Sequence, residues 1–171
     1  MTIYTIGHSS RSLEELLEIL GAWKIELLVD VRSLPGSRKF PQFNRESLEA
    51  ALPEKGVEYL HLKGLGGLRK KLVETSLNQA WENTAFRNYA DYMQTEEFQE
   101  GLSALLAAAE VKRTAIMCAE AVPWRCHRQL ISDAVVALRR VDVFHILTAA
   151  KGQDHKLTSF SKVQEGRVIY P

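Results

Sequence analysis

The segment Cys118–Arg128 holds the densest group of reactive side chains in the chain and reads Cys-Ala-Glu-Ala-Val-Pro-Trp-Arg-Cys-His-Arg. It follows an apolar run typical of a buried strand, and its proline suits the first turn of a helix. Such a junction offers free amide groups and the positive end of a helix dipole to an anion. Arg125 and Arg128 are three residues apart, which would place both guanidinium groups on one helix face. The segment therefore predicts a site for a small anionic ligand.

Two familiar cysteine chemistries fit this segment only in part. A phosphatase or sulfurtransferase loop needs an arginine six positions after its cysteine nucleophile, and Trp124 stands there relative to Cys118. The segment Cys118–Arg128 also lacks the glycine of such loops. Even so, the helix dipole and the arginines would favour a thiolate here. A zinc site would instead take both cysteines and two histidines. Its ligands would be Cys118, Cys126, His127 and His8, whose spacing matches no common zinc motif.

A third chemistry assigns the reaction to a carboxylate. Glu120 would act as acid, base or nucleophile, while His127 and the arginines orient the substrate. We favour this assignment because a carboxylate among cationic groups at a strand end calls for a function. The catalytic candidates are therefore Glu120, Cys118 and His127. The structural alternative is that both cysteines are small core residues, as free cysteines commonly are.

Polar side chains also follow the other strands that the sequence predicts. Ligands of open parallel sheets bind at the edge where the carboxyl ends of the strands meet, so we expect these side chains to share one rim. The binding candidates are His8, Ser9, Asp30, Arg32, Ser37, Arg38, Tyr59 and Arg128. The arginines of this set would hold the anion. Its histidine, aspartate and tyrosine would orient groups together with His127.

Five apolar or β-rich runs predict strands and alternate with segments of helical periodicity. The strands are expected at residues 2–6, 25–31, 57–62, 113–118 and 141–147, with a short terminal strand at 167–170. Strands alternating with helices indicate a mostly parallel sheet with helices on both faces. We therefore expect a three-layer α/β fold with about five strands, formed by one domain over residues 1–171.

Local signals predict where the helices begin and end. Ser12 and Glu15 form a capping box before an apolar stripe, and Asn44 stands where an N-cap is expected. One helix is expected from Pro123 to about Arg140. The stretch 64–83 is expected to be a loop with a short helix at most.

Composition narrows the class of protein. The 171 residues carry a formal net charge of +1, with 46% hydrophobic and 25% charged residues, so no broad basic surface for nucleic acid is expected. No apolar run is long enough to span a bilayer, and the first residues lack the pattern of a signal peptide. Two cysteines do not make a disulfide framework. We expect a cytoplasmic protein with no membrane partner.

Several segments together resemble the family known as domain of unknown function 488. The resemblance rests on Gly7-His8-Ser9, Asp30-Val31-Arg32 with Pro35 and Ser37, Tyr59 with Leu65-Gly66-Gly67, Phe86-Arg87 with Tyr89–Met93, and Cys118-Ala119-Glu120 with Cys126-His127-Arg128. These segments stand in the family's order and spacing and span nearly the whole chain. The resemblance implies a compact α/β domain in which they are signature positions. The family has no established reaction, so the resemblance implies no substrate.

The clustering of reactive groups predicts an enzyme. Its substrate would be a small anion, related to a nucleotide or nucleobase, and the reaction a hydrolysis or group transfer without a cofactor. One alternative is a non-catalytic module that binds nucleic acid or a nucleotide, which a steep salt dependence of binding would reveal. The other is a zinc-dependent hydrolase that uses Cys118, Cys126 and histidines, which metal analysis would reveal.

Overall fold

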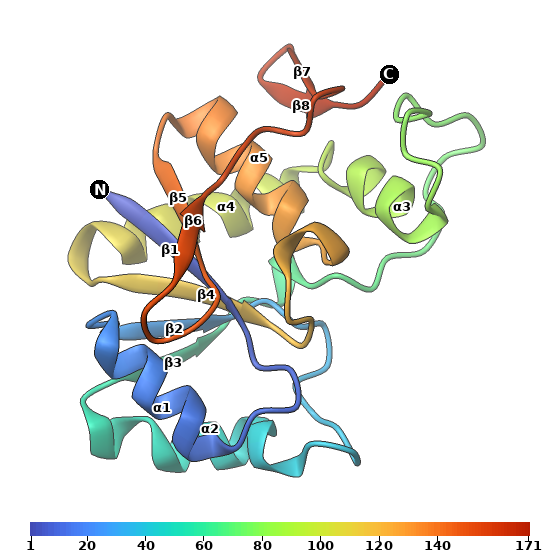
Figure 1. The fold of residues 1–171 in the computed structure, drawn as a ribbon. Coiled ribbons are helices and arrows are strands. Elements are labelled where there is room, and N and C mark those ends of the chain that lie inside the picture. Colours follow the sequence, from blue (N-terminus) through green and yellow to red (C-terminus); the bar gives the residue numbers. More distant parts are fainter.

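A six-stranded sheet forms the middle layer of the computed structural model, which describes residues 1–171 (Figure 1). Its strands are β1 (Thr2–Gly7), β2 (Leu27–Asp30), β3 (Glu58–His61), β4 (Thr114–Cys118), β5 (Asp142–Ile146) and β6 (Gly152–Asp154). From edge to edge the order is β3-β2-β4-β1-β5-β6. Strands β1 to β5 are mutually parallel, and only β6 is antiparallel to its neighbour. The mostly parallel sheet expected from the alternating elements is thus confirmed.

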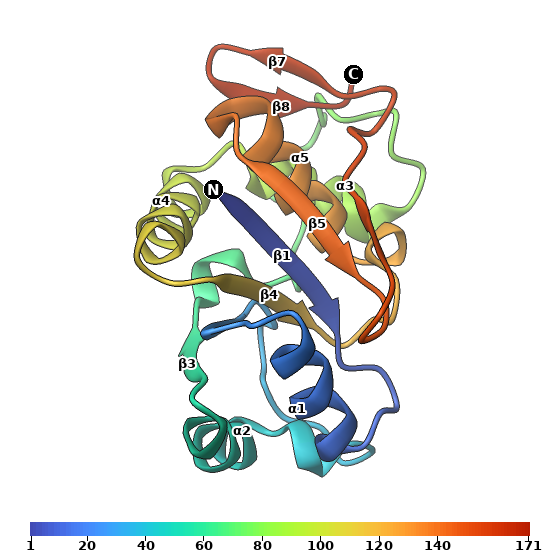
Figure 2. The same cartoon turned by 60° about the vertical axis from the view of Figure 1, so that its left-hand side comes forward.

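Helices cover both faces of this sheet, which completes the three layers (Figures 1 and 2). They are α1 (Leu13–Ala22), α2 (Arg45–Ala51), α3 (Thr84–Tyr92), α4 (Glu96–Val111) and α5 (Arg128–Arg139). The first two pack on one face and the other three on the opposite face. Successive strand residues point to opposite faces, so Tyr4 joins the core under α1 and α2, whereas Ile3 joins the core under α3, α4 and α5. No helix combines the length and apolar character needed to cross a membrane.

The two N-terminal capping signals have different outcomes. Ser12 caps α1 as predicted, because its hydroxyl accepts from the Glu15 amide at 3.1 Å and the Glu15 carboxylate accepts from the Ser12 amide at 3.2 Å. Asn44 precedes α2, but its side chain does not cap that helix. Its Oδ1 accepts instead from the Ser37 amide at 2.7 Å, so Asn44 stabilises the loop that follows β2.

The connection after β4 differs from the single helix expected from Pro123 to Arg140. Pro123–Arg125 form one 3-10 turn, Cys126 is extended, and α5 begins only at Arg128. Arg125 and Arg128 therefore do not share a helix face: Arg125 is exposed and Arg128 is fully buried. The break follows from the sulfur of Cys126, which accepts the Arg128 amide at 3.3 Å and replaces a helical backbone partner.

Outside the main sheet, the chain ends in a two-stranded antiparallel hairpin of β7 (Lys162–Gln164) and β8 (Arg167–Ile169), in agreement with the terminal strand expected at 167–170. The stretch 64–83 holds only the end of a 3-10 turn, Lys63–Leu65, and is otherwise a loop. Asp91 of α3 anchors that loop, because its Oδ1 accepts from the Ser76 hydroxyl and from the Asn78 amide nitrogen at 2.8 Å.

Candidate functional site

The order of the strands opens a crevice at the carboxyl end of β4. This strand lies between β1 and β2, although it follows both in the chain by more than 80 residues. The chain leaves β1 and β2 toward the face of α1 and α2, whereas it leaves β4 toward the face of α5. Connections that diverge in this way leave a gap beyond the strand ends, which is where ligands bind in open α/β sheets.

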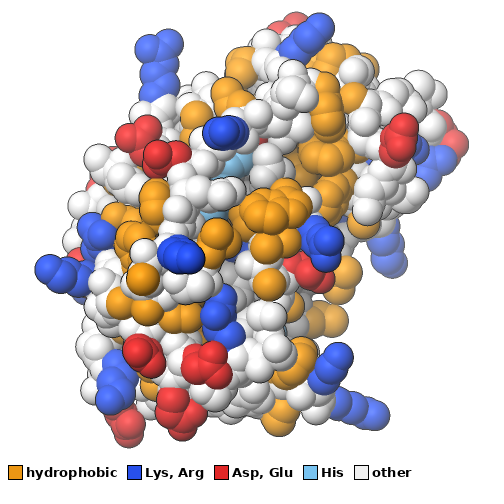
Figure 3. Space-filling model, viewed as in Figure 1, with side chains coloured by type: hydrophobic (Ala, Val, Ile, Leu, Met, Phe, Trp, Pro, Cys, Tyr) orange, Lys and Arg blue, Asp and Glu red, His pale blue; other side chains and the backbone are white.

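A cleft of about 600 Å³ lies at this position, lined by residues that follow β1, β2 and β4 together with residues of α3. Six of the residues expected at the site line it, namely His8, Arg32, Ser37, Cys118, Glu120 and His127. Its other cationic groups are Lys39 and Arg125, and its apolar wall includes Phe40, Leu68 and Phe86. Apolar side chains gather beside Lys and Arg side chains on the face shown in Figure 3.

The other binding candidates lie outside the lining. Asp30 and Arg128 lie beneath it and bond to Arg32 and Cys118 of the lining, whereas Tyr59 bonds to Asp30. Ser9 joins two strand ends, because its amide donates to the Ala119 carbonyl at 2.9 Å. Arg38 is exposed, and its side chain forms no ion pair.

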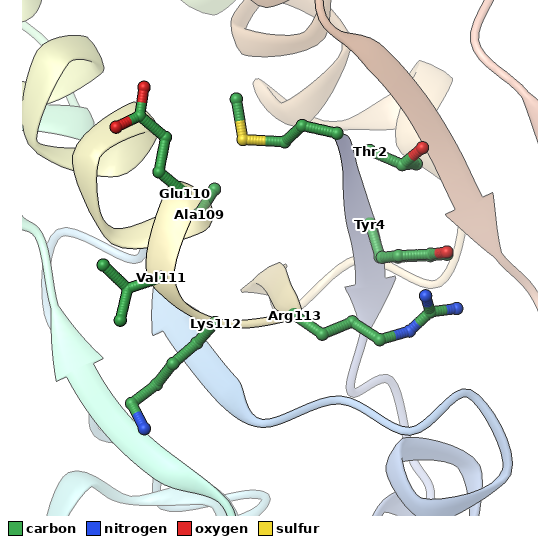
Figure 4. Close-up of a pocket in the computed structure, with 8 residues that line it drawn as sticks. Thr2, Tyr4, Ala109, Glu110, Val111, Lys112 and Arg113 are labelled. Carbon is green, nitrogen blue, oxygen red and sulfur yellow. The ribbon is translucent and has the colours of Figure 1, made fainter.

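A second pocket, of about 580 Å³, lies at the opposite end of the sheet, where α4 leads into β4 (Figure 4). It is lined by Met1, Thr2, Tyr4 and residues 109–113. It holds no thiol and no imidazole, and the Arg113 guanidinium is stacked 4.4 Å from the Tyr4 ring. The reactive side chains therefore belong to the cleft at the carboxyl ends of the strands.

A buried ion pair supports the wall of the cleft beside β2. Arg32 donates from Nε to Asp30 Oδ1 at 2.9 Å and from Nη2 to Oδ2 at 2.7 Å, and the Tyr59 hydroxyl donates to Oδ2 at 2.5 Å. Burial, followed by the bond to Asp30, raises the pKa of Tyr59, so this hydroxyl remains a donor. The Asp30 side chain is fully buried and Arg32 is 8% exposed. This pairing leaves Nη1 of Arg32 as the guanidinium nitrogen without a carboxylate partner, 3.5 Å from Nε2 of His8.

His8 occupies the end of β1 as a neutral acceptor. Its ring stacks on Phe43 with centroids 4.4 Å apart, and its Nδ1 donates to the Ser9 carbonyl at 2.9 Å. Burial lowers the pKa of His8, and the charge of Arg32 acts in the same direction. Nε2 therefore carries a lone pair, 3.5 Å from Nη1 of Arg32.

Arg128 lies behind the cleft and holds both thiols. Its Nε donates to Cys118 Sγ at 3.0 Å and to Cys126 Sγ at 3.4 Å. Its Nη2 donates to the Glu120 carbonyl at 2.6 Å, and its Nη1 to the Thr5 hydroxyl at 3.1 Å. The guanidinium therefore contacts sulfur and oxygen atoms on every side but no carboxylate.

This arrangement gives the two thiols different pKa values. Burial, together with the adjacent Cys126, raises the pKa of Cys118 well above its ordinary value. Burial also disfavours the thiolate of Cys126, but a hydrogen bond from Cys118 and the charge and donors of Arg128 outweigh it and lower the pKa of Cys126 to about 7. Cys126 is therefore the thiol with thiolate character near neutral pH.

His127 is oriented toward Cys126 by the backbone of β2. Its Nε2 donates to the Val31 carbonyl at 2.7 Å, which leaves Nδ1 as an acceptor 3.6 Å from Cys126 Sγ. Burial lowers the pKa of His127. A thiol, an imidazole acceptor and a group that orients the imidazole are the parts of an activated nucleophile.

Two glycines are required for this packing. A Cβ on Gly7 would stand 1.6 Å from the Glu120 carbonyl oxygen, and one on Gly67 would stand 2.6 Å from Nδ1 of His127. Both positions admit only a hydrogen atom. The glycine that ends β1 thus lets the backbones at the ends of β1 and β4 approach closely enough for Arg128 to reach the Glu120 carbonyl.

The expected zinc ligands have other partners. No three His, Cys, Asp or Glu side chains are arranged to hold a metal ion. Nε of Arg128 contacts both sulfur atoms, and a metal ion there would meet that positive charge at hydrogen-bond distance. Both sulfur atoms therefore have Arg128 as their partner.

Sequence reasoning overlooked part of the cleft and the groups behind it. Lys39 and Phe40 directly follow the binding candidates Ser37 and Arg38 but were not named with them, and Phe86 carries the helical spacing of a core residue. Behind the cleft, Thr5 and His145 belong to strands that read as plain core. A polar residue inside an apolar strand was the one signal that could have marked these last two.

One comparison with known proteins gives a match. The family profile described as "Domain of unknown function DUF488" matches residues 12–135, which is well over half of the chain. Searches among curated proteins and among solved structures gave no match. The matched range includes β2, β3, β4 and the segment from Cys118 to Arg128. The chain belongs to the DUF488 family.

Proposed function

We propose that the protein is an enzyme that hydrolyses or transfers a group on a small anionic substrate, bound in the cleft at the carboxyl ends of the strands. Lys39, Arg125 and Nη1 of Arg32 supply positive charge, and Glu120 is the one acidic side chain in the lining. Phe40 and Phe86 supply apolar rings on which a flat group can pack. Charge beside apolar rings suits a substrate of the nucleotide or nucleobase class.

The observation that carries this proposal is the environment of Cys126. Cys126 is a buried lining residue of the cleft, 4% exposed, and its sulfur accepts two N–H groups of Arg128 and lies 3.6 Å from Nδ1 of His127. A pKa of about 7 gives a large thiolate fraction at neutral pH, and the thiolate is the nucleophilic form. We therefore assign the nucleophile to Cys126 rather than to Glu120.

The remaining groups fit a two-step reaction. In the first step the proton of Cys126 passes to Nδ1 of His127, the sulfur attacks the electrophilic atom, and the leaving group departs with that proton. In the second step Glu120 takes a proton from water, which attacks the same atom, and the thiolate of Cys126 leaves and takes up the proton held by Glu120. The sum is the addition of one water molecule across the broken bond. If another nucleophile replaces water, the result is group transfer.

Alkylation by iodoacetamide tests the nucleophile and the cleft together. Cys126 should react faster than Cys118, as followed by peptide mass spectrometry, and adenosine 5′-monophosphate should slow its modification. Arg125→Ala should weaken this protection, whereas Lys112→Ala, at the opposite end of the sheet, should not. Cys126→Ser should abolish turnover of any phosphoester or glycoside that the purified protein hydrolyses in a nucleotide panel. Equal alkylation of both cysteines, or full turnover by Cys126→Ser, would refute the assignment.

A nucleic-acid binding module is the second candidate, and the exposed cations near the cleft favour it. Lys39 and Arg125 lie at the cleft, and Arg38, Lys70 and Lys71 are exposed in the loops that border it. Fluorescence anisotropy with a single-stranded oligonucleotide at increasing salt distinguishes the two functions. A steep loss of affinity supports the binding module, because phosphate contacts release counterions. Binding of adenosine 5′-monophosphate that changes little with salt supports the enzyme.

A further inference from the structure

A chain of buried hydrogen bonds leads away from Arg128 on the side opposite the cleft. The Thr5 hydroxyl lies 2.7 Å from Nδ1 of His145, Nε2 of His145 lies 2.9 Å from Nδ1 of His155, and Nε2 of His155 lies 2.8 Å from Oδ1 of Asp133. We call these four side chains the buried relay: Thr5, His145, His155 and Asp133. Thr5, His145 and Asp133 are at most 2% exposed, and the side chain of His155 is 1% exposed. None of them lines the cleft.

The protons of the buried relay have a single consistent arrangement when both imidazoles are neutral. His155 must donate from Nε2 to the Asp133 carboxylate, so its Nδ1 accepts from Nε2 of His145. Nδ1 of His145 then accepts from the Thr5 hydroxyl, whose oxygen accepts from Nη1 of Arg128. Burial, the neighbouring His155 and the charge of Arg128 lower the pKa of His145 to about 3, which keeps it neutral. Every donor thus points from Arg128 toward Asp133.

The two ends of the buried relay carry opposite charges. Arg128 is fully buried and contacts no carboxylate, and Asp133 is fully buried and contacts no lysine or arginine. Asp133 accepts from His155, from the Thr158 amide at 3.0 Å and from the Tyr170 hydroxyl at 2.8 Å. Isolated buried charges are strongly unfavourable, and aligned hydrogen bonds polarise one another. The buried relay therefore connects Arg128 with Asp133, the fully buried carboxylate of α5.

We propose that the buried relay positions Arg128 against Cys126, and that Thr5, His145 and His155 are positioning residues for the reactive thiol. The Thr5 oxygen fixes Nη1, and the Glu120 carbonyl fixes Nη2. With both ends of the guanidinium held, its Nε remains aimed at the sulfur atoms. This inference rests on the proposed role of Cys126, but it concerns the acidity of that thiol and can be tested without a substrate.

The surroundings of Cys126 make its acidity a direct report on Arg128. The titratable or charged side chains that face it are Cys118 on β4, Tyr89 on α3, and His127 and Arg128 at the start of α5. Of these, Arg128 is the only permanent cation. Replacing a member of the buried relay removes none of these four side chains. A change in the titration of Cys126 would then reflect a displaced guanidinium.

The experiment compares Thr5→Val with Thr5→Ser. Valine removes the acceptor of Nη1 at nearly constant volume, whereas serine keeps it. The rate of Cys126 alkylation by iodoacetamide, followed by mass spectrometry from acid to alkaline pH, gives the midpoint of thiolate formation. For Thr5→Val we expect a midpoint about one pH unit higher and roughly fivefold slower alkylation at neutral pH. Thr5→Ser should keep the wild-type midpoint. A folded Thr5→Val protein with an unshifted midpoint overturns the proposal.

A second pair of variants acts at the far end, in case Thr5→Val does not fold. His155→Leu breaks the buried relay without touching Arg128, whereas His155→Gln retains one donor and one acceptor. His155→Leu should raise the midpoint and His155→Gln should not. A purely structural loss would speed alkylation at every pH through local opening and leave the midpoint in place, which also overturns the proposal. A shifted midpoint in a protein that turns over no substrate would refute the proposed function alone.

Discussion

Asp30→Asn removes the negative charge of the buried pair that supports the cleft wall. Oδ1 of Asp30 accepts from the amide and Nε of Arg32, and Oδ2 accepts from Nη2 of Arg32 and from the Tyr59 hydroxyl. An asparagine must place its NH₂ group at one of these positions. At the Oδ1 position that group meets two N–H donors, and at the Oδ2 position it meets Nη2 of Arg32 beside the Tyr59 hydroxyl. In both orientations Arg32 is left buried without a counter-charge.

The magnitude of this change follows from burial. Breaking a buried ion pair on one side costs about 3–5 kcal/mol of unfolding free energy. In a domain of this size each kcal/mol lowers the melting temperature by about 2–4 °C, so we expect a decrease of about 6–20 °C. Glu49→Gln is the matched control, because the Arg45–Glu49 pair has the same charges but is half exposed. Its loss should change the melting temperature very little, because solvent screens the charges of a surface pair.

Urea unfolding and thermal melting at one pH, followed by circular dichroism, measure both variants. The reasoning fails if Asp30→Asn costs less than about 1 kcal/mol or no more than Glu49→Gln. Replacing Arg32 by Leu in the Asp30→Asn background should then recover part of the loss, because the unpaired buried cation is gone. No recovery would mean that the cost arises from packing rather than from charge.

Three further predictions concern stability and activity. Gly7→Ala should destabilise the protein by about 1–3 kcal/mol or more and slow Cys126 alkylation, because its Cβ would overlap the Glu120 carbonyl. Thermal melting measures the loss. Gly21→Ala is the control: it has open space around its Cβ and should stabilise the protein in the same assay. Since the pKa of His145 is lowered to about 3, its contribution to stability is complete above pH 6.5 and declines by about 1.4 kcal/mol per pH unit as the pH falls toward 3. Urea titrations should therefore show a flatter decline for His145→Gln than for the wild type. Tyr59→Phe should cost about 1 kcal/mol of unfolding free energy, because it removes the bond to Asp30. It should leave the alkylation midpoint of Cys126 unchanged. A moved midpoint would contradict the independence of the Asp30–Arg32 pair from the contacts of Arg128.

Patterns local to each strand predicted the sheet and the rim of the cleft. The apolar runs that end at Asp30 and at Cys118 marked strands by composition, and helices between them implied parallel pairing. Parallel pairing then brings the ends together: Gly7 pairs with Cys118, and Asp30 pairs with both Met117 and His61. Parallel strands all end at the same edge of the sheet, so these residues had to lie together there. The parallel arrangement itself followed from the alternation of strands and helices, which short-range periodicity reveals.

The burial of Arg128 could not be predicted in this way. An arginine near a helix start reads as an exposed anion ligand, and only the break at Cys126 turns it inward. Its partner Thr5 lies 123 residues away in the chain, and Thr5 meets His145 across 140 residues. Contacts over such separations leave no trace in spacing or composition. The partners of Asp133 lie 22 to 37 residues further along the chain, beyond the reach of helical periodicity, so Asp133 reads as an ordinary helix residue.

The place of β4 between β1 and β2 has a consequence for how the molecule forms. Until residues 114–118 pair, neither β1 nor β2 has its central neighbour, and both leave open edges of the kind that promote misassembly. Pairings between such distant segments are slow steps. Because the inserted strand also brings in Cys118 and leads directly to Cys126, pairing at the centre of the sheet and assembly of the cysteine cluster are a single event. A half-folded chain would therefore be inert as well as prone to aggregate.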